Sequence, residues 1–161
     1  MRYGYGVHSP MAFRFIREVL FPGDYAYYAE NDLSKKAALA VRVAHFFPIR
    51  QIIVEEKEEF RPLLRLFEAF HLPSAGGHLQ GPFPSERSYL LFVYPDLNER
   101  AFRDYFHACD STNIICLSDA PKRKSCFRTI IKESAHGVAF HCKSLSVLIQ
   151  SEAFLPHEYY L

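Results

Sequence analysis

Residues 51–58 read QIIVEEKE, a short apolar strand that runs directly into acidic residues. The run Gln51–Val54 is typical of a buried strand, and Pro62 belongs to the first turn of the helix that follows. An α/β protein that binds a nucleotide usually has glycine after its first strand, because any Cβ blocks approach of the ligand to the backbone. Residues 55–60 contain no glycine. The order of elements therefore predicts a nucleotide-type α/β fold whose binding turn is missing.

Composition limits the class of protein. The chain has 161 residues, enough for one domain, and a formal net charge of +1, which gives no electrostatic reason to expect a nucleic-acid or membrane partner. No apolar run is long enough to span a bilayer, and the first ten residues do not form a secretory signal. We expect a cytoplasmic protein. The four cysteines form no CxxC pair, so we expect free thiols rather than zinc ligands or disulfides.

Hydrophobic periodicity divides the single domain into an N-terminal helical part, residues 1–47, and an α/β core, residues 48–161. Ser9 is predicted to cap the first helix, with Pro10 in its first turn and Phe13 on its apolar face. Helices are expected near residues 10–21, 33–46, 62–70, 98–109 and 122–134, and strands near 51–54, 89–94, 113–117, 137–141 and 145–149, with a further short strand around 78–80. The short connection at Lys143-Ser144 predicts a final antiparallel hairpin. The pattern indicates a three-layer αβα sandwich with a mostly parallel sheet.

The stretch GVHSPMAFRFIREVLF, residues 6–21, resembles the opening of a bacterial family of class I S-adenosylmethionine-dependent methyltransferase-like proteins, which begin with a GVHSPF-type motif. Residues 89–161 also follow the order of that family: a strand ending in an acidic turn, a helix, a strand ending in Asp, a helix and a closing hairpin. The resemblance implies a Rossmann-like methyltransferase fold. It also implies that this chain is a shortened member.

The departures from that family concern the cofactor site. Class I enzymes carry an acidic, glycine-rich loop after the first strand, where this chain has Val54-Glu55-Glu56. Either the loop is deleted and the first two strands have merged, or the first strand simply lacks it. If the strands have merged, Glu55 takes the place of the acidic residue that holds the cofactor ribose. Otherwise these glutamates form a solvated run that favours a helix N-terminus.

Two aspartates complete the candidate cofactor-binding residues. Asp96 and Asp119 both follow predicted strands, so they could share a cleft with Glu55, or instead cap the next helices. Relatives that bind a metal favour acidic residues where this chain has Tyr94 and Ser118. We therefore predict no metal site and assign no catalytic residue.

The hypothesis that follows is a methyltransferase-fold protein that no longer binds the cofactor and acts as a non-catalytic interaction or structural module, a pseudoenzyme. The alternative is an active S-adenosylmethionine-dependent methyltransferase with a minimal pocket. A third class, a nucleic-acid binder, would use the basic helix face at Lys122, Arg123, Lys124 and Arg128, against the near-neutral charge. We also expect residues 24–31 (DYAYYAEN) and Tyr159–Leu161 to cover the shortened sheet, within one chain or in a homodimer.

Overall fold

The computed structural model describes residues 9–22, 35–54, 61–69, 74–76, 89–93, 98–108, 113–143 and 145–161. The chain forms two compact units, Met1–Phe47 and Pro48–Leu161, which are described separately. The described helices of the first unit are α1 (Pro10–Phe15), the π-helix η1 (Ile16–Leu20) and α2 (Lys35–Phe46).

The first unit begins with the cap that the sequence predicts. Ser9 Oγ accepts a hydrogen bond from Ala12 N–H at 3.2 Å, and Pro10 is the first helical residue. The expected apolar face is wrong in one place, because Phe13 is 42% exposed whereas Phe15 is fully buried. The widened turn η1 ends at Phe21, whose N–H donates to the carbonyl oxygen of Ile16.

Long side chains tie α2 to the preceding helices. Arg42 Nε donates to the carbonyl oxygen of Val19 at 2.8 Å. The ring of Phe15 lies 5.5 Å from that of Phe46 and 5.7 Å from that of Phe47. Both kinds of contact stabilise the first unit, since the guanidinium satisfies a carbonyl group at a helix end and the rings bury apolar surface.

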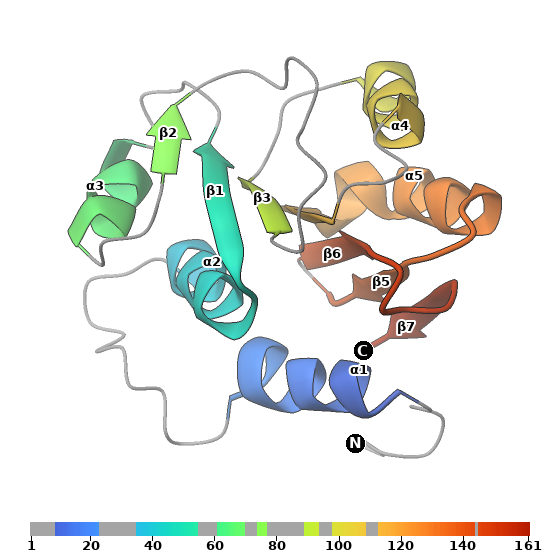
Figure 1. Cartoon of the computed structure of the whole chain (residues 1–161), viewed down its shortest axis with the longest axis horizontal. Helices are drawn as coiled ribbons and strands as arrows, with labels where there is room; N and C mark the ends of the chain where they lie inside the picture. The colour runs from blue at the N-terminus through green and yellow to red at the C-terminus, as the bar shows by residue number, and fades with distance from the viewer. Residues whose placement is uncertain are drawn as a thin grey trace. The chain divides into compact units, whose positions relative to one another are not determined.

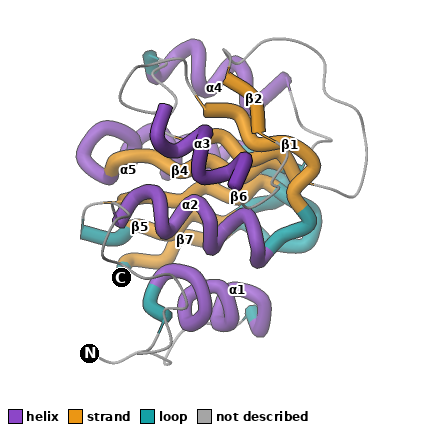
Figure 2. Tube along the Cα trace, turned by 90° about the vertical axis from the view of Figure 1, so that its left-hand side faces the viewer, coloured by secondary structure: helices purple, strands orange, loops and turns teal. Residues whose placement is uncertain are grey.

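The second unit is an α/β structure built on one mixed sheet (Figures 1 and 2). Its described elements are β1 (Ile49–Val54), α3 (Arg61–Ala69), β2 (Ser74–Gly76), β3 (Tyr89–Val93), α4 (Glu99–Ala108), β4 (Ile114–Asp119), α5 (Ala120–Glu133), β5 (Val138–His141), β6 (Leu145–Gln150) and β7 (His157–Tyr160). The strand order is β2-β1-β3-β4-β6-β5-β7. Figure 2 shows this order from β2, towards the top of the view, down to β7.

The pairing corrects the expected sheet in part. The strands β2, β1, β3 and β4 are parallel, and the predicted antiparallel hairpin of β5 and β6 is present. The hairpin does not simply close the sheet, because β6 lies between β4 and β5, antiparallel to both. A further strand, β7, pairs in parallel with β5 at the edge. The sheet is therefore only partly parallel.

Two other expectations about strands change. A short strand, β2, lies beside β1 and parallel to it. It spans Ser74–Gly76, and the predicted position 78–80 lies outside the described residues, as does the segment 24–31. The C-terminal tyrosines form β7, at the opposite edge of the sheet from β2, so they do not cover the shortened side. The homodimer stays a prediction.

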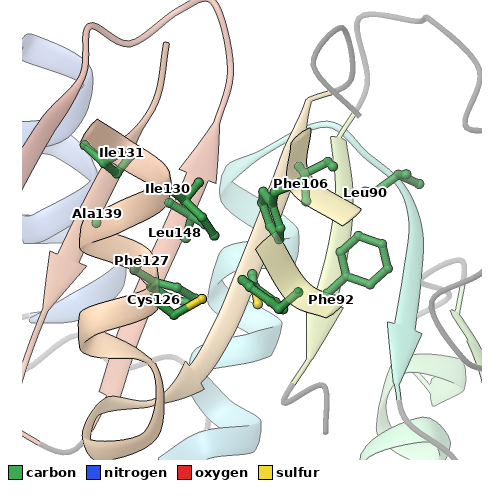
Figure 3. Close-up of a cluster of buried hydrophobic side chains, with 12 residues drawn as sticks. Leu90, Phe92, Phe106, Cys126, Phe127, Ile130, Ile131, Ala139 and Leu148 are labelled. Carbon is green, nitrogen blue, oxygen red and sulfur yellow. The ribbon is translucent and has the colours of Figure 1, made fainter. Parts of the chain in front are cut away.

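A buried cluster joins α4 and α5 to one face of the sheet (Figure 3). The buried positions of α5 recur at helical spacing and form a single stripe, made of Arg123, Cys126, Phe127, Ile130 and Ile131. Phe127 packs against Phe102 of α4, with ring centroids 5.6 Å apart. Below them lie side chains of four strands, namely Leu90, Phe92, Ile114, Cys116, Ala139 and Leu148.

Ion pairs add to this contact at the surface. Glu133 of α5 accepts hydrogen bonds from Arg103 Nη2 at 3.0 Å and lies 2.9 Å from His107 Nε2, both on α4. The contact with His107 and then the positive charge of Arg103 hold the pKa of the Glu133 carboxyl below its ordinary value. These groups are exposed, so the apolar cluster rather than the ion pairs supplies most of the stability.

One glycine shapes the entry to β5 and β7. Gly137 has φ of +137°, a conformation that other residues rarely adopt, and an added Cβ would lie 2.9 Å from the carbonyl oxygen of Ile149. Its N–H donates to the carbonyl oxygen of Phe154, and its own carbonyl accepts from His157 N–H at 3.2 Å. Gly137 therefore fixes the start of β7 against the start of β5.

Removing the ring of Phe127 tests the central cluster. Phe127 is fully buried, so Phe127→Ala should lower the free energy of unfolding by about 3–5 kcal/mol. The control is Leu155→Ala, whose side chain is 81% exposed and whose loss should change stability by about 0.5 kcal/mol or less. Urea denaturation measures both. A loss below about 1 kcal/mol for Phe127→Ala would show that α5 does not depend on this contact.

Candidate functional site at the carboxyl edge of the sheet

The carboxyl ends of the parallel strands meet at one edge of the sheet, and the chain changes direction there. From β1 the chain passes through α3 to β2 on one side, whereas the next strand, β3, lies on the other side of β1. Open α/β sheets bind ligands outside the strand ends at such a switch point. Here it lies between Val54 and Val93, which are paired in register. This is the place where a cofactor would be expected.

The described residues at the switch point are apolar. Val54 and Val93 are buried, with 0% and 1% exposure, and the neighbour of Val54 in β2 is Gly76. At these three strand ends, the described part of the chain supplies no side chain that could hydrogen-bond a ribose or an amino acid carboxylate.

Of the three predicted cofactor-binding residues, only Asp119 lies within the described residues. Glu55 and Asp96 lie outside the described residues, so their role stays a prediction. Asp119 is the last residue of β4, and its backbone pairs with Leu145 of β6. It therefore lies one strand beyond the switch point, next to β3. In the described part of the chain, no three His, Cys, Asp or Glu side chains are grouped closely enough to hold a metal.

A row of polar residues crosses the other half of the same edge. Ser118, Ser146, His141 and Tyr160 occupy neighbouring positions on β4, β6, β5 and β7. Because side chains alternate along a strand, all four belong to the face that α4 and α5 cover. Lys124 and Arg128 of α5 lie against Tyr160, at the β7 end of this row.

His141 is the central residue of this row. It is 2% exposed, and its Nδ1 lies 3.1 Å from Ser146 Oγ. Its Nε2 is buried and has no hydrogen-bond partner among the described residues. Burial lowers the pKa of the imidazole below its ordinary value; Glu158 opposes this shift, whereas Lys124 and Arg128 reinforce it. His141 is therefore held as a neutral ring.

Charged residues of α5 and β7 surround Tyr160. Arg128 Nη2 donates to Tyr160 Oη at 2.7 Å, and Tyr160 O–H donates to Glu158 Oε2 at 2.6 Å. Lys124 Nζ lies 4.8 Å from the centre of the Tyr160 ring. The predicted basic face of α5 is thus only partly a solvated surface. Arg123 departs from it further, because it is buried with its guanidinium 5.0 Å from the ring centre of Phe102.

The described cluster is not arranged for nucleophilic catalysis. Ser146 lies beside an imidazole, as an activated serine would, but it has no exposed surface, so no substrate can reach its Oγ. Burial raises the pKa of Cys126 to about 11 and raises the pKa of Cys116 further. Both thiols stay protonated at neutral pH, whereas the thiolate is the nucleophile. The described thiols are free, as expected.

The sequence analysis missed this cluster because it did not predict β7. The signal was weak: two tyrosines with high strand propensity, Tyr159 and Tyr160, follow Pro156 in a short C-terminal segment. The enclosure of His141 could not be predicted for a related reason. It ends an apolar strand, and only the pairing of β5 with both β6 and β7 shows that it is enclosed.

Comparison with models of protein families, with curated proteins and with solved structures finds no match to this chain. Within the described residues, no helix is both long enough and apolar enough to cross a membrane.

Proposed function

We propose that this chain is a methyltransferase-fold protein that does not bind S-adenosylmethionine and acts as a non-catalytic interaction or structural module. The proposed fold is the Rossmann-like three-layer sandwich of class I methyltransferases. In this role the chain binds another protein or a second copy of itself, and it needs no cofactor.

The order and pairing of the elements support the fold. The chain runs β3, α4, β4, α5 and then the β5–β6 hairpin, and β4 ends at Asp119, as the resemblance to the methyltransferase-like family implies. The β5–β6 hairpin corresponds to the closing hairpin that the resemblance implies, and its strand β6 lies between β4 and β5, antiparallel to both.

One observation supports the proposed loss of cofactor binding. At the switch point two buried valines, Val54 and Val93, end neighbouring strands, and the sequence between Val54 and Arg61 reads EEKEEF, without glycine. A cofactor that must approach the backbone at the end of β1 would meet a Cβ at every position of that turn. The first strand therefore lacks the feature on which binding in class I enzymes depends.

Calorimetric titration with S-adenosylhomocysteine and with S-adenosylmethionine tests this proposal. We expect no saturable heat with either ligand, because the turn after β1 offers no close backbone approach. A methyltransferase with an intact glycine-rich loop serves as the positive control for the ligand stocks. Binding at low-micromolar dissociation constant with one ligand per chain would overturn the proposal.

An active methyltransferase with a minimal pocket is the second candidate, and one observation favours it. Gly76, the last residue of β2, pairs in register with Val54, and Gly77 follows it in the sequence. Glycine is thus present beside the carboxyl end of β1, although it belongs to the neighbouring strand. A backbone approach from that side would leave Glu55 as the group that accepts hydrogen bonds from the ribose.

Substitution of Glu55 tests the second candidate. If the chain binds the cofactor through this carboxylate, Glu55→Ala should weaken binding by about 1–3 kcal/mol, the usual cost of losing a hydrogen bond to a charged group. That corresponds to a rise in the dissociation constant of about fivefold to 150-fold, measured by calorimetry. Glu68→Ala, an exposed carboxylate on α3, is the matched control. Equal affinity of wild type and Glu55→Ala would exclude this version of the site.

A further inference from the structure

The edge strand β7 is attached to the sheet by few interactions. It has four residues and, among the described strands, pairs with β5 only. Its backbone is tied at the two ends: His157 N–H donates to the carbonyl oxygen of Gly137, and Leu161 N–H donates to that of His141 at 2.9 Å. Short edge strands with one neighbour open at lower free energy than central strands.

Side chains add further contacts to this attachment. The rings of Phe140 and Tyr159 stack with centroids 5.2 Å apart, and the rings of His141 and Tyr160 lie 5.0 Å apart. Arg128 of α5 reaches Tyr160 Oη and also lies 3.6 Å from Glu158 Oε2. His141 is thus in contact with β7 through its ring and through its carbonyl oxygen.

The groups that face His141 come from three elements. From α5 come the cations Lys124 and Arg128, and from β7 come Glu158 and the ring of Tyr160. The described part of β6 contributes the neutral Ser146. Two cations therefore act against one carboxylate around a buried ring. One oxygen of that carboxylate, Glu158 Oε2, accepts from Tyr160, and the other, Oε1, is buried without a hydrogen-bond partner among the described residues.

Protonation of the buried His141 ring is unfavourable in this arrangement. Nδ1 already faces Ser146 Oγ, so a doubly protonated ring would leave the buried Nε2–H without an acceptor among the described groups. It would also place a positive charge near Lys124 and Arg128. A buried, unpaired charge is costly, so the ring takes up a proton most readily when it becomes solvated.

We propose that His141, Glu158, Tyr160 and Arg128 form a proton-sensitive latch, the β7 latch, which releases β7 from β5 and α5 when His141 becomes protonated. Release exposes the backbone edge of β5 and the stacked faces of Phe140 and Tyr159, and allows water to reach the imidazole. An exposed strand edge can pair with another strand. The chain would thus present a different surface at mildly acidic pH than at neutral pH.

Proton linkage determines whether closure of β7 is favoured or weakened as the pH falls. The pKa of His141 is lowered in the closed state, whereas in the released state it returns towards its ordinary value of about 6.5. The released state then binds more protons, so closure is favoured above this value and weakens as the pH falls below it. Because the released imidazole has its ordinary pKa, the equilibrium constant for release should rise between pH 7.5 and pH 5.5 by up to about tenfold.

Hydrogen exchange measured by NMR tests the latch. The amides of His157 and Leu161 report on release, because both donate to backbone carbonyls of the segment 137–141. After correction for intrinsic exchange, their opening constants should rise from pH 7.5 to pH 5.5 by up to about tenfold. They should also exceed that of Leu148, in the central strand β6, at every pH. A flat pH dependence, or opening constants equal to that of Leu148 throughout, would overturn the proposal.

Substitutions of single histidines test whether His141 causes the pH dependence of release. His141→Gln keeps a partner for Ser146 but does not titrate, so it should abolish this rise. The control His136→Gln, at an exposed position outside β7, should retain it. An unchanged rise in His141→Gln, or its loss in His136→Gln, would overturn the latch. If His141→Gln does not fold, the wild-type imidazole signals decide: the latch requires an apparent pKa below about 6.5, and a value at or above it overturns the proposal.

Discussion

The packing of α5 on the sheet is the interaction on which the rest of the second unit depends. One stripe of the helix, centred on Phe127, buries itself against β4, β6 and β5. Because the helix connects β4 to β5 while β6 lies between them, it also covers the inserted antiparallel strand. The same helix carries Lys124 and Arg128 on its next face, so the contact that forms the core also brings two cations over Tyr160 and next to His141.

Much of this unit could be predicted from sequence because the signals are local. The apolar runs at Tyr89–Val93 and Ile114–Leu117 allow only buried strands, and Asn98 caps α4 with a hydrogen bond from Ala101 N–H to its Oδ1. The hairpin follows from the short connection at residue 143. Arg123 does not belong to the exposed basic face that neighbouring cations suggest, because its guanidinium packs on Phe102.

What could not be predicted depends on contacts between distant segments. The strand β7 is held in place by the stacking of Tyr159 on Phe140 and by the hydrogen bond from His157 N–H to the carbonyl oxygen of Gly137. Neither contact produces a periodic pattern in the sequence. The enclosure of His141 follows from the same pairing. In the first unit, Phe13 and Phe15 are two residues apart, and their opposite exposures reflect which ring meets Phe46 and Phe47 rather than hydrophobicity. Of the candidate cofactor residues, only Asp119 could be placed, by its backbone pairing.

The central claim is that the switch point between β1 and β3 no longer receives a cofactor. Methyl NMR spectra recorded during titration with S-adenosylhomocysteine test it at the residues concerned, since Val54 and Val93 end the two strands and carry methyl groups. The account predicts that both valine signals stay unchanged up to millimolar ligand, even if weak shifts occur elsewhere. Saturable shifts of both signals at micromolar ligand would show that the site still binds the cofactor and would contradict the account.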